Sequence, residues 1–267
     1  MGKSIVLGQF IPIESPIHSL DPRVKIILAG VLIFILFIVQ DWFSFLFLGI
    51  FIFGLTLTAH IPTGYLLKSL KPILFLLVFT LVLQIFFTPG EVIWEYGILR
   101  ISREGFVRGL FIIVRLCLLI LATSLLTLTT TPVELTDGLE YLMNPFKRWG
   151  FPAHELAMMM TIAIRFIPTL LEEADRIMKA QEARGANFET GSIIQRAKNL
   201  IPLLVPLFIN SFKRADDLAI AMESRCYRGG IGRTRLRVLQ LKQSDYRFLF
   251  LSLAFITFVT FSSFFLW

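Results

Sequence analysis

The chain is 267 residues long, 55% hydrophobic and only 17% charged, and it contains 27 phenylalanines. This composition is typical of an integral membrane protein and excludes an ordinary soluble domain. The net charge is +7, but basic and acidic residues are mixed along the predicted helices, which argues against nucleic acid as a partner.

Five apolar stretches approach the roughly 20 residues that a helix needs to cross a bilayer. They are residues 24–40, 42–59, 72–88, 106–130 and 248–267. Asp21 is placed to cap the first of these helices, with Pro22 in its first turn. The sequence therefore predicts an all-α integral membrane protein with about five transmembrane helices. Residues 1–130 form a tail and four spans, residues 131–247 form a separate domain of long amphipathic helices, and residues 248–267 form the last span.

The orientation follows from the positions of lysine and arginine. The N-terminal segment carries Arg23 and Lys25, the loop after the second span carries Lys68 and Lys71, and residues 131–247 carry most of the 26 basic residues. Because basic residues concentrate on the cytoplasmic side, we expect a multi-pass protein of the cell membrane with its N-terminus and residues 131–247 in the cytoplasm. Five spans then place the C-terminus outside.

The fourth predicted span contains two arginines, Arg108 and Arg115, which are seven residues apart and share one helix face. An arginine within a membrane span is costly unless it packs inside the protein or reaches the headgroups. One interpretation is that Arg115 packs inside the protein or extends to the lipid headgroups. The other is that it forms a functional pair with another group.

The 131–247 domain is predicted to consist of three helical pieces. The first covers residues 132–149, is capped by Thr131 and is interrupted near Pro145. The second runs from 152 to 184, with Pro168 as a kink. The third runs from 192 to about 227. Both long pieces carry an apolar stripe that needs a covering surface.

A shift of 41 positions superimposes the ends of the two long helices. Each end presents one arginine between small residues, in Ala183-Arg184-Gly185 and in Ser224-Arg225-Cys226. The matching pairs are Ala174/Ala215, Asp175/Asp216, Ala180/Ala221, Glu182/Glu223 and Arg184/Arg225.

Two roles suit an arginine at the end of a helix. It can complement the helix dipole, which is worth about 0.3–1 kcal/mol. It can also enter a cleft of a partner and bind a carboxylate with both ends of its guanidinium group. We favour docking, because dipole complementation needs only some cation, whereas both copies keep arginine between small neighbours.

Motifs for chemistry are not found in the sequence. The three histidines, His18, His60 and His154, lie on separate segments, and Cys117 and Cys226 are far apart. No nucleophile, base or metal cage emerges, so we expect no catalytic, cofactor-binding or metal-binding residues on this chain. A membrane-embedded lipid-modifying enzyme is a disfavoured alternative, because it would require such groups.

Three segments carry a family resemblance: residues 20–25 (Leu-Asp-Pro-Arg-Val-Lys), residues 163–168 leading to 183–185, and residues 219–227. With them the chain resembles the T component of energy-coupling factor (ECF) transporters, which is related to the membrane subunits of cobalt and nickel importers. The first tripeptide matches the Ala-Arg-Gly signature of that family. The second departs from it as Ser-Arg-Cys.

The resemblance implies a non-catalytic subunit of an ATP-driven importer. Two ABC-type ATPases (EcfA and EcfA′-like) would hold ATP and magnesium, and a small membrane protein, the S component, would capture a vitamin or micronutrient. This chain would couple them in the bilayer. A T component dedicated to one substrate, such as cobalt, nickel or biotin, is an alternative, and the residues that select the cargo would lie on the S component. The ATPase-docking residues would be Ala183, Arg184, Gly185, Ser224, Arg225 and Cys226, and the S-component contacts Leu203, Leu204, Leu207, Phe208 and Phe212.

Overall fold

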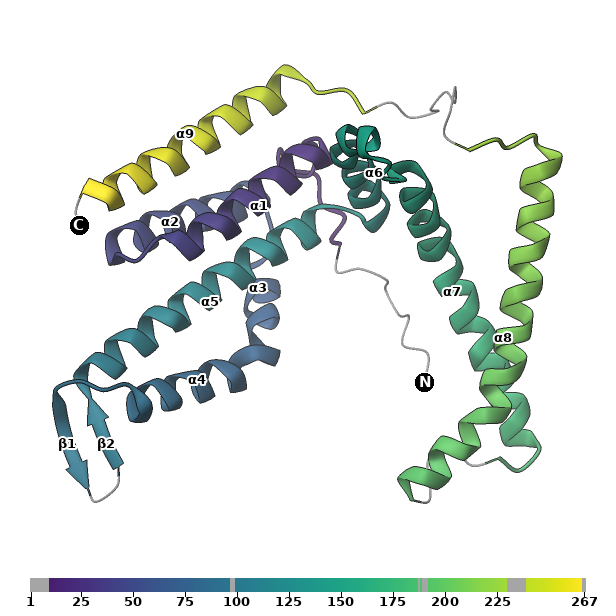
Figure 1. Cartoon of the computed structure of the whole chain (residues 1–267), viewed down its shortest axis with the longest axis horizontal. Coiled ribbons are helices and arrows are strands. Elements are labelled where there is room, and N and C mark those ends of the chain that lie inside the picture. The colour runs from purple at the N-terminus through teal and green to yellow at the C-terminus, as the bar shows by residue number, and fades with distance from the viewer. Residues whose placement is uncertain (1–9, 97–98, 187, 189–191, 230–238, 266–267) are drawn as a thin grey trace. The chain divides into compact units, whose positions relative to one another are not determined.

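The computed structural model describes residues 10–96, 99–186, 188, 192–229 and 239–265. Within these ranges the chain is helical except for one small hairpin and its connecting loops (Figure 1). It divides into a bundle unit, Gly8–Leu139 with Val238–Trp267, and an arm unit, Glu140–Arg237 with Met1–Leu7. The predicted all-α membrane architecture is confirmed.

The bundle unit is organised around one long helix, α5. This helix packs against α1, α2, α3 and α4, while α9 packs against α1 and α2. Leu36, Leu48 and Ile256 lie fully buried at the centre. The helices are α1 (Pro22–Ile38), α2 (Trp42–Thr58), α3 (Thr63–Leu70), the short 3-10 helix η1 (Lys71–Ile73), α4 (Leu74–Phe87), α5 (Arg103–Thr129) and α9 (Gln243–Phe265).

Among the described residues, four helices are long and apolar enough to cross a membrane. They are Thr63–Phe87, Arg103–Thr129, Ala153–Ala183 and Gln243–Ser263, and Trp42–Thr58 is a shorter apolar helix. The chain is therefore a multi-pass membrane protein. The third predicted span begins earlier than expected, because α3 and η1 extend it back to Thr63. Ala153–Ala183 also satisfies the length and composition criterion, although its charged residues are concentrated in its second half.

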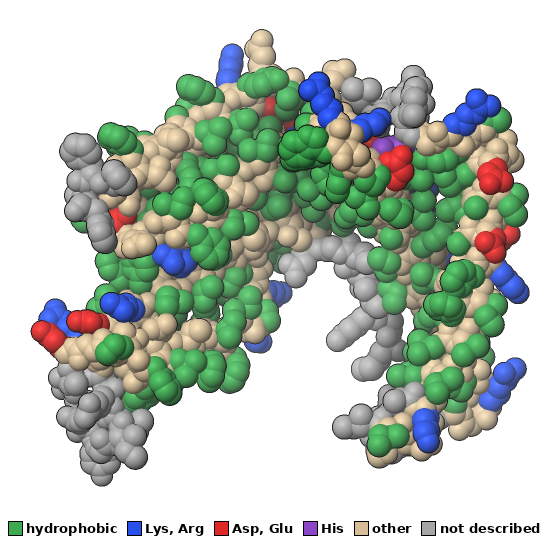
Figure 2. Space-filling model, viewed as in Figure 1, with side chains coloured by type: hydrophobic (Ala, Val, Ile, Leu, Met, Phe, Trp, Pro, Cys, Tyr) green, Lys and Arg blue, Asp and Glu red, His purple; other side chains and the backbone are tan. Residues whose placement is uncertain are grey.

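Large hydrophobic side chains cover much of the outer surface of the molecule. Phe75 and Phe87 are each 80% exposed, and Phe250 is 74% exposed. Hydrophobic side chains are accordingly spread over the helices seen in Figure 2. A soluble protein rarely exposes so much apolar surface, whereas lipid tails are a suitable solvent for it.

Local capping chemistry explains where several helices begin. The Asp21 carboxylate accepts a hydrogen bond from the Arg23 amide at 2.9 Å, as the predicted cap requires. Helix α6 (Pro132–Met143) opens with a reciprocal pair, in which the Glu134 amide donates to the Thr131 hydroxyl and the Thr131 amide donates to the Glu134 carboxylate. This capping box satisfies two backbone donors that the helix leaves free. The caps predicted at Asp21 and Thr131 are confirmed.

Charged side chains are buried together where α1 and α9 begin and α5 ends. Lys25 is 6% exposed, and its ammonium group donates to the carbonyls of His18 and Thr129. Asp245 is 2% exposed and accepts from the amides of Lys242 and Asp21. Because buried charges are tolerated only with partners, these bonds fix three chain segments to one another.

Arg115, for which the sequence left both packing and a functional pairing open, lies inside the bundle unit. Its guanidinium group donates to the carbonyl of Val39 at 2.8 Å, and Val39 is the residue that ends α1. The same group lies 5.7 Å from the ring centre of Phe45 and 5.4 Å from that of Phe111. The arginine is thus held by packing, and it satisfies a carbonyl that the helix end leaves without an internal partner.

A two-stranded antiparallel hairpin connects α4 to α5. Its strands are β1 (Val92–Tyr96) and β2 (Leu99–Ser102). The hairpin was not predicted from the sequence. Its signal is the β-branched and aromatic composition of the first strand, which is short and lies between two much stronger helical patterns.

The arm unit contains the short 3-10 helix η2 (Asn144–Trp149), α7 (Ala153–Ala183) and α8 (Ile193–Ser224). These match the helical pieces expected from the sequence to within a few residues, including the break at Asn144. Pro168 lies inside α7, and Pro202 and Pro206 lie inside α8. Helices α7 and α8 pack together and cross in opposite directions, so that their C-terminal ends lie on opposite sides of the crossing (Figure 1).

Candidate functional site

The end of α7 is a compact turn built around Gly185. Arg184 is the last residue of the helix cap, and Gly185 adopts a left-handed backbone with φ of 89°. The Gly185 amide donates to the carbonyl of Glu182, and the Ala186 amide donates to that of Gln181, both at 2.9 Å. This pair of bonds is a Schellman motif, which satisfies the last helical carbonyls with the chain's own backbone.

The end of α8 has the same construction, although its sequence differs. Arg225 occupies the cap, the Cys226 amide donates to the carbonyl of Glu223, and the Tyr227 amide donates to that of Met222. Cys226 takes the left-handed position with φ of 55°, where α7 has glycine. The departure from Ala-Arg-Gly to Ser-Arg-Cys therefore keeps the backbone geometry that presents the arginine.

Both arginines are exposed. Within the part of the chain that the structure describes, neither guanidinium group of Arg184 and Arg225 makes a hydrogen bond or an ion pair. Because the backbone already satisfies each helix end, neither side chain is needed to cap its own helix. The small neighbours Ala183, Gly185, Ser224 and Cys226 are exposed as well. The six predicted docking residues therefore form two separate exposed tips.

The predicted apolar contact surface on α8 is only partly available. Leu203 is buried and Leu207 is half-buried, so these two side chains face the protein interior. Leu204, Phe208 and Phe212 are 56%, 65% and 56% exposed. The rings of Phe208 and Phe212 meet edge to face with centroids 4.7 Å apart.

Three further residues on α8 were missed by the sequence prediction. Ile201, Val205 and Ile209 are each at least half exposed and follow one another at four-residue intervals. That spacing places them along one side of a helix, so the exposed apolar face is wider than predicted. Hydrophobic side chains are visible along α8 in Figure 2. The sequence carried this signal, but it was hidden because the helix is apolar on more than one side.

The crossing of α7 and α8 adds a polar contact that the sequence prediction did not identify. The Glu173 carboxylate receives one hydrogen bond from the Asn210 amide group and another from the Arg214 guanidinium group, each at 2.6 Å. Closer to the end of α7, the Gln181 side chain donates to the carbonyl of Pro202. Later residues of α7 thus meet earlier residues of α8, as expected for helices of opposite direction.

The described residues contain no group of three or more His, Cys, Asp or Glu side chains placed to hold a metal ion. The arm unit does contain one pair of potential ligand types, His154 Nδ1 and Glu140 Oε1, 2.9 Å apart. What the arm unit offers is therefore two cationic tips and an apolar face, which are suited to binding other proteins.

Comparisons with known proteins identify the family. Residues 14–236 match the sequence profile of the cobalt transport protein family CbiQ. The chain is 54% identical over 243 residues to the energy-coupling factor transporter transmembrane protein EcfT of Thermosediminibacter oceani, covering 91% of this chain and 92% of that protein. It is 53% identical over 248 residues to the protein of the same name from Clostridium kluyveri, covering 92% of each.

A third relative is less similar in sequence, but the match is about as long. The EcfT protein of Bacillus subtilis is 48% identical over 240 residues, which cover 90% of this chain and 91% of that protein. The similarity thus extends over the bundle unit and the arm unit alike, and the resemblance noted from the sequence is confirmed. The chain belongs to the CbiQ and EcfT family of transporter membrane components, and it is not an enzyme.

Proposed function

We propose that the chain is the energy-coupling subunit of an ECF-type ABC importer, and that it transmits the motion of two ATP-hydrolysing subunits to a substrate-binding S component. The observation that supports this proposal is the pair of matching helix ends. Two crossed helices end in the same Schellman turn, and each presents an exposed arginine without a partner among the described residues. Two equivalent tips suit a partner that offers two equivalent sockets.

The energetics favour docking over a structural role. A cation that only complements a helix dipole contributes about 0.3–1 kcal/mol. An arginine bound to a carboxylate in a desolvated cleft is worth more, and removing one partner of such a pair costs about 2–5 kcal/mol. The exposed tips meet the first requirement of this binding mode, because their guanidinium groups are free to form bidentate bonds.

The test replaces Arg184 and Arg225 by alanine, singly and together, in the assembled transporter. We expect ATPase subunits to co-purify poorly with the single variants and less still with the double variant, and uptake to fall with them. Lys213→Ala is the matched control, since it removes an exposed cation from α8 away from the tip. Normal ATPase association and uptake in the double variant would refute the docking role.

The exposed face of α8 is proposed to hold the S component, with Leu204, Phe208 and Phe212 at its centre. Phe208→Glu should release the S component while the ATPases remain bound, because the substitution places a charge on an apolar surface far along the helix from the tip. Loss of the ATPases alone would contradict this assignment. Leu203→Glu is expected instead to damage the arm unit itself, because Leu203 is buried.

The proposed orientation places the N-terminus and residues 131–247 in the cytoplasm, where the ATPases would bind. The support is the concentration of lysine and arginine in these segments. The cargo is proposed to be a vitamin or another micronutrient chosen by the S component. Identification of the small membrane proteins that co-purify with the tagged chain would separate a shared module from one dedicated to cobalt, nickel or biotin.

A further inference from the structure

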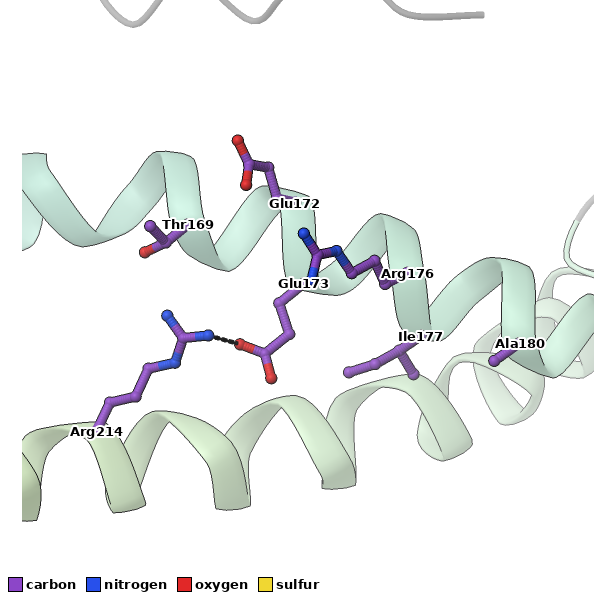
Figure 3. A pocket seen from close by; sticks show the side chains of 7 residues that line it. All are labelled: Thr169, Glu172, Glu173, Arg176, Ile177, Ala180 and Arg214. Atoms are coloured by element: carbon purple, nitrogen blue, oxygen red, sulfur yellow. Dashed lines mark hydrogen bonds and ion pairs between the residues drawn. The ribbon is translucent and has the colours of Figure 1, made fainter.

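The contact at the crossing of α7 and α8 is an ion pair reinforced by an amide. Figure 3 shows Glu173 extending from α7 towards Arg214 on α8. The two groups are 2.6 Å apart, and their side chains are 16% and 42% exposed. Asn210 donates to the second oxygen of the Glu173 carboxylate. The pair lies in a groove of about 360 Å³ whose other walls are Thr169, Glu172, Arg176, Ile177 and Ala180.

The two charged residues occupy equivalent positions in the internal repeat. The shift of 41 residues that pairs Arg184 with Arg225 also pairs Glu173 with Arg214, since both differences equal 41. In a pair of helices exchanged by a two-fold axis, equivalent positions touch each other only where the axis passes. The direct contact between Glu173 and Arg214 is the arrangement expected of a local two-fold axis through the crossing.

The placement of a second pair of residues agrees with this symmetry. Exchange of the two helices converts the pair Glu173 and Asn210 into the pair Thr169 and Arg214, because Thr169 is the repeat equivalent of Asn210. Thr169 and Arg214 line the same groove, and both are drawn beside the ion pair in Figure 3. The two equivalent positions differ in chemistry, because Asn210 carries an amide and Thr169 carries a hydroxyl.

The axis relates the two tips to each other. Arg184 follows Glu173 by 184 − 173 = 11 residues, and Arg225 follows Arg214 by 225 − 214 = 11 residues. At about 1.5 Å per residue, each arginine lies about 16 Å along its helix from the crossing. Any rotation or slip at the crossing therefore changes the separation of the two tips.

Few apolar side chains of these two helices are fully buried. Among the described side chains of α8, only Leu203 is buried, and in α7 only Ala153 and Ala157 are. These residues lie away from the ion pair in the chain. A half-buried ion pair contributes little net stability, but it can fix the register of two helices.

We propose that Glu173 and Arg214 are positioning residues, whose ion pair locks the two arms in register on a local two-fold axis and so sets the spacing of Arg184 and Arg225. The role in coupling rests on the proposed function, whereas the lock itself is a property of this chain alone.

The sharpest test uses the equivalence of the two positions. Arg214→Glu places two carboxylates at the crossing and should break the lock. The double substitution Glu173→Arg with Arg214→Glu should restore it, because the carboxylate and the guanidinium group then exchange places between two repeat-equivalent positions. The exchanged carboxylate faces Thr169 in place of Asn210, so adding Thr169→Asn should supply the missing amide. A lock without symmetry would not be improved by Thr169→Asn.

One readout needs no partner. Spin labels on Lys179→Cys and Ile220→Cys, two exposed and repeat-equivalent positions, report the distance between the arms in the purified chain with Cys117 and Cys226 replaced by serine. The distance distribution should shift or broaden with Arg214→Glu and return with the exchange. An unchanged distribution in Arg214→Glu would overturn the lock, whatever the ATPases do.

The second readout is transport per ATP hydrolysed by the assembled transporter. A positioning role predicts that uptake falls about tenfold in Arg214→Glu while ATP hydrolysis persists, and that the exchange recovers uptake to within about twofold. A merely structural role would lower both in proportion to the amount of intact complex. Arm distances that respond while uptake stays normal would overturn the positioning role. Failure of the docking proposal would instead appear as normal ATPase binding in the Arg184 and Arg225 variants.

Discussion

The bundle unit and the arm unit differ in the burial and bonding of their charged side chains. In the bundle unit, Lys25 and Asp245 are almost completely buried, and each is bonded to groups of other segments. In the arm unit, Arg184 and Arg225 are exposed and have no partner among the described residues. In the bundle unit these charges are thus bonded internally, whereas the arm unit presents two cations at its surface, which the proposed docking would bind to other chains.

The largest effect on stability is expected where a buried charge loses its partner. Asp245→Ala removes the acceptor of hydrogen bonds from two backbone amides. It also removes an anion from a cluster in which Arg23 and Lys25 are buried. We expect a loss of about 3 kcal/mol in the free energy of unfolding, measured by thermal unfolding of the purified protein in detergent. Asp217→Ala, which removes an exposed carboxylate of α8, should change it by less than about 0.5 kcal/mol. If the two substitutions changed the free energy of unfolding equally, the proposed difference between buried and exposed charges would be wrong.

A smaller effect, with opposite signs, is expected at the two helix ends. Gly185→Ala forces a side chain into the left-handed region at φ of 89° and should cost about 1 kcal/mol locally. Cys226→Gly should stabilise its turn by about 0.5–1 kcal/mol, because it removes that cost. Hydrogen exchange of the Ala186 and Tyr227 amides measures each turn directly. Cys226→Ala is the control and should leave exchange unchanged, so a large change there would show that φ is not the cause.

The smallest effect is expected from His18 in the bundle unit. Burial and, after it, the charge of Lys25 lower the pKa of His18 from its ordinary value of 6.5. The folded protein then holds fewer protons than the unfolded chain, so stability falls as the pH drops below 6.5 towards the lowered pKa and is constant above. The loss should be smaller than the effects at the helix ends, because the ring is half-buried and solvent screens it.

The measurement is thermal unfolding between pH 5 and pH 8, a range that brackets the histidine titration. His18→Gln should flatten the profile in that range. A profile that keeps its slope in this variant would assign the pH dependence to another group.

Most helices were predictable from the sequence because their signals are local. Long apolar runs, the cap at Asp21 and the break at Asn144 gave the elements to within a few residues, apart from the early start at Thr63. The two arginines were found because a 41-residue repeat left identities around them. The equal geometry of the two turns was only half visible, since Cys226 takes a left-handed conformation that a sequence pattern assigns to glycine.

What escaped prediction depends on contacts between distant segments. Glu173 reads as part of a solvated helix face until α8 is placed beside it, and only the crossing shows that it binds Arg214. Likewise, the split of the apolar stripe into buried Leu203 and exposed Phe208 depends on how α7 crosses α8. No local pattern determines a crossing, because several packing geometries suit the same stripe.

The most direct test of the docking role uses the cysteine that already stands beside one tip. With Cys117 replaced by serine, Cys226 is the single thiol and is exposed next to Arg225. A membrane-impermeant maleimide should modify it at least about tenfold more slowly in the complex with both ATPases than in the isolated chain, since docking covers the tip. Arg225→Ala should abolish this protection. Equal rates of modification with and without the ATPases would contradict the proposal that the arginine tips seat in those subunits.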